Sequence, residues 1–312
     1  MHMNDALVNP AVAGVAGIIS ATMLVISLKK VKQNNSNEII PTMGVMGAFI
    51  FVAQMINFSI PGTGSSGHII GAVLLSAILG PWAGFIVLSS VLIIQCLIFA
   101  DGGLLALGCN IFNMGVLSCL IAYPLFFKPF IKHTISFGKL LTISVITCVI
   151  GLELGAFAVT IETTLSGITA LPMGNFLLFM LPIHLAIGIC EGVATAIVLH
   201  FIQKNSPIML YGTNEPNEHT QSSSQKHVII IAIIAILILG TISTYIASSY
   251  PDGLEWSIIN VTGDVLNSET PRLSSFALMP DYNHPLSGIA GSILVIIVIY
   301  AISTIIAKRT KQ

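Results

Sequence analysis

The first two residues, Met1 and His2, carry three nitrogen atoms that could bind one metal ion together. They are the α-amine of Met1, the backbone amide of His2 once it has lost its proton, and Nδ1 of the His2 imidazole. These nitrogens would close two adjacent chelate rings in one plane, which suits metals that favour square-planar nitrogen ligation, such as Ni²⁺ or Cu²⁺. Because His2 is too bulky for the usual removal of an initiator Met, we expect Met1 to stay in place.

A second histidine, His68, ends a Gly- and Ser-rich loop over residues 59–68 and stands just before an apolar stretch. Each histidine alone could have a simpler role, because His2 could be incidental and His68 could cap a helix or lie at the membrane interface. The pair is more informative, since the topology predicted below places both on the same side of the membrane. Neutral imidazole is a common metal ligand, so His68 could supply a fourth nitrogen.

Five further polar side chains lie in largely apolar surroundings and could support such a site. In a metal site they would orient the ligand imidazoles or hold the N-terminal segment in place. The alternative is hydrogen bonding between membrane helices, worth about 0.6–2 kcal/mol per bond, and we expect a mixture of both roles. The candidates are Asn57, Gln95, Asp101, Asn110 and Asn113.

Two ionisable residues, His184 and Glu191, are seven positions apart within one apolar segment and therefore share a helix face. An ionisable group inside a membrane span is a candidate functional residue. We expect Glu191 to lie nearer the cytoplasm than His2 and His68, which argues against direct metal binding. We therefore interpret both residues as structural or coupling residues.

The composition identifies an integral membrane protein. Of 312 residues, 54% are hydrophobic and only 8% are charged, with a mean hydropathy of +0.93, whereas soluble domains carry about 25% charged residues. The apolar runs are long and unbroken, which favours membrane helices over a barrel. We expect an all-α fold with about nine transmembrane helices, near residues 10–28, 41–58, 69–80, 83–100, 104–126, 141–161, 176–201, 227–248 and 286–307.

The chain divides into two parts at a polar stretch. We expect a seven-helix domain over residues 1–205, a flexible cytoplasmic linker over 206–226, and a two-span module over 227–312 with a polar outside loop at 249–285. The segment after Gly80 restarts at Pro81, and the span at 69–80 is short, so its ends should lie inside the bundle. Small residues such as Gly188 and Gly192 would allow close helix contacts.

The basic residues predict the orientation. With nine crossings and the N-terminus outside, every Lys and Arg except Arg272 falls on the cytoplasmic side, as the positive-inside rule requires. The C-terminus is then cytoplasmic, and we expect a multi-pass protein of the cell membrane. The cytoplasmic set comprises Lys29, Lys30, Lys32, Lys128, Lys132, Lys139, Lys204, Lys226, Lys308, Arg309 and Lys311.

Several functions find no support in the sequence. The net charge of −1 gives no sign of nucleic-acid binding, and the five cysteines form no CxxC pair. There is no phosphate-binding GxxxxGK[ST] motif and no nucleophile–base arrangement, so we expect no enzyme activity in this chain. The N-terminal residues also lack the basic region of a cleavable signal peptide.

The motifs resemble the CbiM/NikM family, the membrane substrate-binding components of energy-coupling-factor (ECF) metal importers, a class of ABC transporter. The resemblance covers about residues 1–205, and Pro251-Asp252-Gly253-Leu254-Glu255 resembles the PDGLE domain, the small N component of the same transporters. The matching stretches are Met1-His2-Met3, Met46-Gly47-Ala48-Phe49, Ala53-Gln54-Met55-Ile56-Asn57-Phe58, Gly64-Ser65-Ser66-Gly67-His68, Phe99-Ala100-Asp101-Gly102-Gly103 and Gly108-Cys109-Asn110-Ile111-Phe112-Asn113.

The resemblance implies that the N-terminal segment inserts into the bundle. Metal would then be held in a square plane by the Met1 amine, the His2 amide and imidazole, and the His68 imidazole. It also implies partners, namely two cytoplasmic ATPase subunits and a transmembrane coupling subunit, in addition to the metal ion and membrane lipid.

Three functional hypotheses remain open. The first is Ni²⁺ binding for energy-coupled import, with Co²⁺ import for cobalamin biosynthesis as its alternative. The second is an organic-vitamin-binding subunit or a scaffold, which the scarcity of Trp and Tyr makes less favourable. The third is a second module that regulates metal loading through outside acidic residues, although a solvated loop is the simpler interpretation. Those residues are Asp252, Glu255, Asp264, Glu269 and Asp281.

Overall fold

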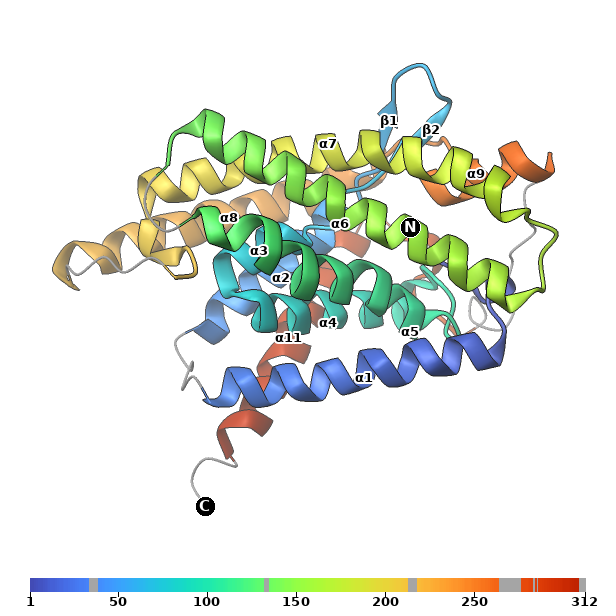
Figure 1. Ribbon diagram of the computed structural model, residues 1–312. Helices are drawn as coiled ribbons and strands as arrows, with labels where there is room; N and C mark the ends of the chain where they lie inside the picture. Colours follow the sequence, from blue (N-terminus) through green and yellow to red (C-terminus); the bar gives the residue numbers. More distant parts are fainter. Residues whose placement is uncertain are drawn as a thin grey trace.

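The computed structural model describes residues 1–33, 39–131, 135–212, 218–263, 276–282, 284 and 286–308. Within them the protein is a bundle of long helices that lie side by side (Figure 1). Some residues named above lie outside the described part of the chain. They are Lys132, Asp264, Glu269, Arg272, Arg309 and Lys311, together with the side chains of Asp281 and Lys308.

Seven described helices are long and apolar enough to cross a membrane. This finding confirms the helical membrane fold, whereas the number nine depends on counting two shorter apolar helices as well. In chain order the helices longer than three residues are α1 (Pro10–Gln33), α2 (Ile40–Gln54), α3 (Ala72–Leu79), α4 (Pro81–Phe99), α5 (Leu107–Asn110), η3 (Ile111–Phe127), α6 (Phe137–Ser166), α7 (Met173–Asn205), α8 (Glu218–Ile246), α9 (Gly253–Thr262) and α11 (Ser287–Lys308).

Helix α3 has eight residues, too few to cross a hydrocarbon layer that needs about 20. All eight are buried, so both ends lie inside the bundle as expected. The chain then turns at Gly80, whose φ of 82° favours glycine, and Pro81 begins α4, where a missing N–H costs nothing.

Helices α6 and α7 pack along one another. A side chain at Gly188 or Gly192 of α7 would collide with the backbone of Val149 or Val145 of α6. These glycines therefore allow the backbones to approach closely, which is how membrane helices gain packing contacts.

The second module packs against the first. Helices α8 and α11 contact α2, and α11 also contacts α4. Between α8 and α11 the backbones meet at Gly240 and Gly288, and a side chain at Gly288 would collide with the backbone of Gly240. The two modules therefore pack together along α2, and α9 adds a further contact on α7.

The loop predicted over residues 59–68 contains a short antiparallel hairpin. Strand β1 (Phe58–Ile60) pairs with β2 (Ser65–Gly67), and Phe58 lies opposite Gly67. Three-residue strands rich in Ser and Gly show no alternation of apolar and polar residues, so the sequence pattern did not indicate them.

Two further boundaries differ from the prediction. Helix α8 begins at Glu218, inside the stretch expected to be a flexible linker, and helix α9 occupies the first part of the expected polar loop. Asp252 caps α9, accepting a hydrogen bond from the Glu255 N–H, and Gly263 ends the helix with a φ of 77°. Side-chain capping of this kind stabilises short helices that hydropathy does not reveal.

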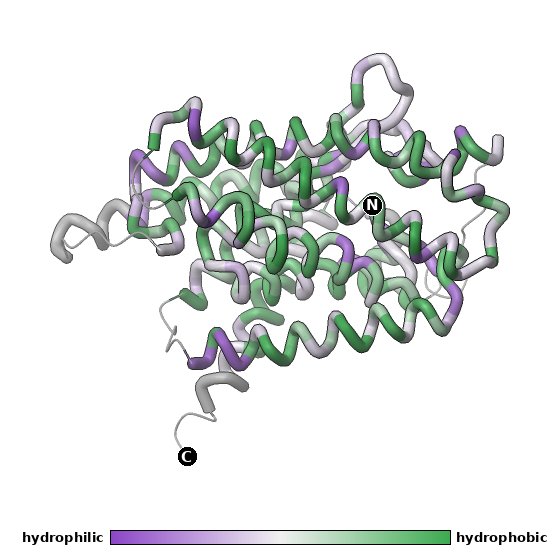
Figure 2. The backbone as a smooth tube through the Cα atoms, viewed as in Figure 1, coloured by the Kyte–Doolittle hydropathy of each residue, from purple (hydrophilic) through white to green (hydrophobic). Residues whose placement is uncertain are grey.

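Polar and apolar residues are separated along the bundle. In the view of Figures 1 and 2, helix α1 ends at the left, where hydrophilic residues gather and where α8 also begins. The hairpin and α9 lie toward the right. The candidate metal residues therefore lie near the end opposite the basic end of α1.

Candidate metal site

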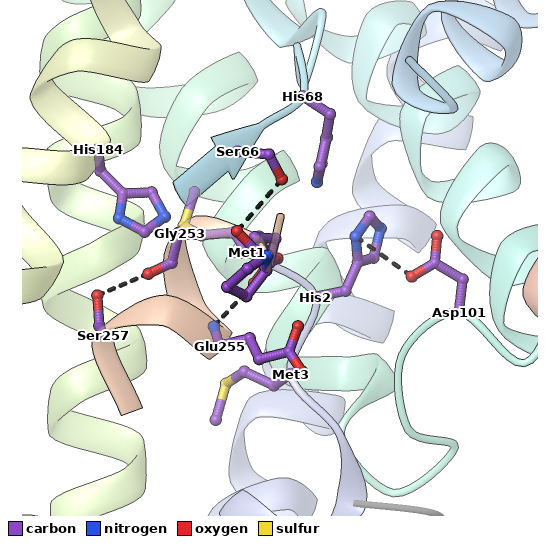
Figure 3. A network of polar contacts seen from close by, with 12 residues as sticks. Met1, His2, Met3, Ser66, His68, Asp101, His184, Gly253, Glu255 and Ser257 are labelled. Carbon is purple, nitrogen blue, oxygen red and sulfur yellow. Dashed lines mark hydrogen bonds and ion pairs between the residues drawn. The ribbon is translucent and has the colours of Figure 1, made fainter. Parts of the chain in front are cut away.

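The first eight residues lie within the bundle although only Asp5–Leu7 form a helical turn, η1. As whole residues, Met1 and Met3 are 4% and 0% exposed, and Leu7 and Val8 are also buried. Figure 3 shows Met1 among side chains of the hairpin region and of helices α7 and α9. The amino terminus is thus an interior group of the protein.

Asn110 holds this segment in place. Its Oδ1 accepts a hydrogen bond from the Met3 N–H at 2.8 Å, and its Nδ2 donates to the Met3 carbonyl at 3.0 Å. The Gly103 N–H donates to the same carbonyl at 2.9 Å. A buried segment without helical hydrogen bonds must satisfy its backbone groups in this way.

His2 lies beside two of the predicted supporting residues. Its Nε2 is 3.3 Å from Oε1 of Gln95, and its Nδ1 is 3.6 Å from Oδ1 of Asp101. The other oxygen of Asp101 accepts a hydrogen bond from the Tyr282 hydroxyl at 2.7 Å. Gln95 and Asp101 thus contact the His2 ring from two sides. Gln95, at Nε2, is placed as a group that supports a ligand imidazole, whereas Nδ1 would have to turn away from Asp101 to bind metal.

His68 faces His2. The two rings are stacked with their centroids 5.1 Å apart and their planes at 29° (Figure 3). Nδ1 of His68 is 3.3 Å from the Ile69 carbonyl, and among the described residues Nε2 has no hydrogen-bond partner. Burial, then the nearby amino terminus and His2, lower the pKa of His68 to about 3. His68 is therefore neutral near pH 7, as a ligand must be.

Glu191 fixes the segment that follows His68. Its two carboxylate oxygens accept hydrogen bonds from the N–H groups of Ile70 and Gly71, both at 2.9 Å. His184, two turns earlier on the same face of α7, has Nδ1 2.7 Å from the Met180 carbonyl and a buried Nε2 without a partner among the described residues. Glu191 thus connects α7 directly to the histidine loop.

The amino terminus forms an ion pair with Asp252 of the second module. Asp252 Oδ2 lies 3.0 Å from the Met1 amine, and Oδ1 accepts the Glu255 N–H at 2.8 Å. Burial would raise the pKa of Asp252, but the amino terminus and these hydrogen bonds outweigh it and hold the pKa well below its usual value. The sequence indicated Asp252 as part of the PDGLE motif and as one of the outside acidic residues, but not as a partner of the amino terminus.

A cavity of about 480 Å³ opens beside these groups. The first module contributes Gln54 and Asn57 in addition to the two histidines, and the second contributes Tyr250 and Tyr282. Asn57 has a second role, because its backbone carbonyl accepts a hydrogen bond from the Ser248 N–H at 2.8 Å. The cavity is therefore shared between the modules.

Asn113 contacts Met3 and Glu162 rather than the two histidines. Its Nδ2 donates to Glu162 at 2.7 Å and lies 3.7 Å from the Met3 sulfur. Sequence reasoning did not identify Glu162 or Tyr282 as parts of this network. Neither residue has a local motif, since their partners are more than 40 positions away in the chain.

The groups in this region that could bind a metal ion form an unusual set. In the described part of the chain, no three His, Cys, Asp or Glu side chains gather as a metal cluster. A metal ion here would need nitrogens of the chain terminus besides the two imidazoles. Such a set is rich in nitrogen and suits a late transition metal, although the stacked rings are not in one plane and would have to turn.

Comparison with sequence families gives two matches. The family CbiM, described as the cobalt uptake substrate-specific transmembrane region, matches residues 2–209. The PDGLE domain matches residues 225–308. Together the two matches include most of both modules.

Individual relatives agree with these matches. A protein of Archaeoglobus fulgidus, provisionally named as the fused nickel transport protein NikMN, is 29% identical over 97% of this chain and 98% of its own length. The cobalt transport protein CbiM of Clostridium tetani is 29% identical over 65% of this chain and 85% of its own length. A crystal structure titled as a truncated transition metal transporter is 32% identical, with a TM-score of 0.57 over 65% of this chain and 99% of that one.

Proposed function

The chain belongs to the CbiM family, fused to a PDGLE domain, and from this premise we propose that it binds Ni²⁺ for energy-coupled import. The coarser function follows from the family itself, since its members are membrane components of nickel or cobalt uptake. The identity of the metal, its ligands, the orientation in the membrane and the partner subunits are proposals beyond this family assignment.

We assign the metal ligands to the Met1 amine, the His2 amide and imidazole, and the His68 imidazole. The observation that supports this most is the buried amino terminus beside two facing imidazoles. Ni²⁺ would be the transported substrate, and the planar nitrogen set favours it. Because the amine and amide must lose protons to bind, affinity should weaken as pH falls.

Co²⁺ is the alternative substrate. Relatives named for nickel share the fused two-module organisation, whereas the relative from Clostridium tetani is named for cobalt. The cavity has amide, aromatic and aliphatic lining residues, but its two facing imidazoles beside the amino terminus favour a metal ion over an organic vitamin. The fusion therefore favours nickel.

The orientation and partners complete the proposal. The basic residues of α1 and the end of α7 lie away from the hairpin and α9, so the positive-inside rule places the metal residues outside and the C-terminus in the cytoplasm. Since we found no ATP-binding motif in the sequence, two cytoplasmic ATPase subunits and a transmembrane coupling subunit would supply the energy.

The experiment is a calorimetric titration of the full-length protein, purified in detergent through a C-terminal tag, with Ni²⁺ and with Co²⁺. One added residue before Met1 should abolish binding, because the amine becomes an amide. His68→Ala should weaken binding at least about a hundredfold, more than loss of a supporting residue outside the ligand set. His284→Ala, which removes an exposed histidine of the second module, is the matched control.

A planar four-nitrogen nickel complex should be yellow, whereas octahedral nickel is pale green. An N-terminally extended protein that retains one equivalent of nickel would contradict the ligand assignment. Tighter binding of Co²⁺ than of Ni²⁺ would favour the alternative substrate.

A further inference from the structure

The loop that leads into helix α9 is docked on the hairpin. The Ser66 N–H donates to the Pro251 carbonyl at 2.8 Å, and the Ser66 hydroxyl donates to the Tyr250 carbonyl at 2.8 Å. The Trp256 indole N–H donates to the Thr63 carbonyl at 3.0 Å. The second module thus binds the histidine loop through one backbone hydrogen bond, part of an isolated parallel bridge between Ser66 and Asp252, and two side-chain hydrogen bonds to carbonyl groups.

From this docked loop the Asp252 carboxylate reaches the amino terminus. One oxygen serves the start of α9 and the other faces the Met1 amine. The Met1 side chain is 2% exposed and that of Asp252 is 24% exposed. Among the described residues, Asp252 is the only carboxylate paired with this amine.

The other charged or titratable groups nearby do not replace it. Asp101 lies beside His2, on the far side of the paired histidines from Met1 (Figure 3). Glu255 forms no ion pair with the Met1 amine among the described residues, and the imidazole of His184 cannot supply a negative charge. A buried cationic amine without a counter-charge is costly, so Asp252 stabilises the terminus in its buried position.

We propose that the fused second module completes the metal site, with Asp252 as the residue that positions the Met1 amine for metal binding. This inference rests on the proposed function. The docked loop then fixes the amine, the histidine loop and α9 relative to one another, and Asp252 is a positioning residue, because it acts through the amine and does not itself bind metal.

The test compares full-length Asp252→Asn with Asp252→Glu and Glu255→Gln. Asn is as good a helix cap as Asp, and the backbone contacts with Ser66 remain, so only the charge beside the amine is lost. Two readouts are needed, namely Ni²⁺ affinity by titration and the rate at which an aldehyde selective for α-amines modifies metal-free protein, followed by mass spectrometry.

A metal-bound amine has lost one proton but still carries N–H groups, so Asp252 can keep a hydrogen bond to it and hold it toward the metal. Asp252→Asn should therefore weaken nickel binding by about tenfold to a hundredfold, as expected for loss of a hydrogen bond to a charged group. It should also speed modification of the terminus severalfold and lower the melting temperature modestly, because the buried amine has lost its counter-charge. Asp252→Glu should recover part of both effects, and Glu255→Gln should match the unaltered protein within about twofold, since rim charges contribute little.

Unchanged affinity and unchanged modification in Asp252→Asn would overturn this inference and leave the proposed function intact. Unaltered protein that binds neither metal would overturn the proposed function itself. A fall in melting temperature equal to that of a general packing defect, with no recovery in Asp252→Glu, would also overturn the positioning role.

Discussion

Residues 1–8 and helix α1, which follow one another in the chain, satisfy their backbone groups in opposite ways. The first segment has almost no regular structure, yet it is buried and held by Asn110, Gly103 and Asp252. Helix α1 is regular throughout, yet side chains such as Val15 and Ile18 are 61% and 70% exposed.

The difference follows from the membrane as solvent. Lipid offers no hydrogen bonds, so a lipid-exposed segment must be helical, and irregular backbone is tolerated only where protein groups satisfy it. The terminus can therefore present a free amine and an amide inside the protein, which no residue within a helix could do. The burial of this irregular segment therefore depends on a few polar side chains.

The largest expected difference between the two regions is the loss of unfolding free energy when one apolar side chain in each is truncated. Leu7 is fully buried, so Leu7→Ala should cost about 2–5 kcal/mol of unfolding free energy. Ile18→Ala on the exposed face of α1 should change it by less than about 0.5 kcal/mol. Denaturant unfolding in one detergent would measure both. Equal losses would mean that residues 1–8 are not a packed part of the bundle.

Removal of the Met3 anchor should have the next largest effect. Asn110→Ala leaves the buried Met3 N–H without its partner, at a cost of about 1–3 kcal/mol, and should also weaken nickel binding. Asn260→Ala removes an exposed hydrogen bond to the Trp256 carbonyl on α9 and should be nearly neutral. Thermal unfolding and metal titration would check both variants, and an unaffected Asn110→Ala protein would contradict the anchoring role.

The smallest expected effect is the change in unfolding free energy at acidic pH. Because burial lowers the pKa of His68 from 6.5 to about 3, the unfolded chain binds a proton below pH 6.5 that the folded protein does not. Stability should therefore be fully present above pH 6.5 and decline as pH falls toward 3, by at most about 1.4 kcal/mol per pH unit for this group. Unfolding at pH 7.5, 6.5 and 5.5 should show a shallower slope in His68→Phe than in the unaltered protein.

The sequence was sufficient for the helical membrane fold and for the approximate positions of the long helices, because unbroken apolar runs of about 20 residues are typical of membrane helices. It also pointed to His2, His68 and the supporting residues Gln95, Asp101 and Asn110, which the structure brings to one place. Their role as a metal site stays a prediction. The position of His2 next to the amino terminus, and of His68 at the end of the glycine-rich loop, made these predictions possible.

The features that the sequence did not predict depend mainly on contacts between segments that are distant in the chain. Asp252 lies 251 positions from Met1, and nothing in its own neighbourhood distinguishes a helix-capping Asp from one that also binds an amine. Glu191 was expected as a coupling residue, but its hydrogen bonds to Ile70 and Gly71 required the path of the chain into α3. The hairpin and α9 were too short and too polar for hydropathy to reveal.

The docking of Tyr250 and Pro251 on Ser66 has a further consequence because both partners belong to one polypeptide. Covalent attachment makes their encounter intramolecular, and the packing of α8 and α11 on α2 already holds the two modules together. The few hydrogen bonds between loop and hairpin therefore suffice in a fused chain, whereas the same surfaces on separate subunits would need a larger interface.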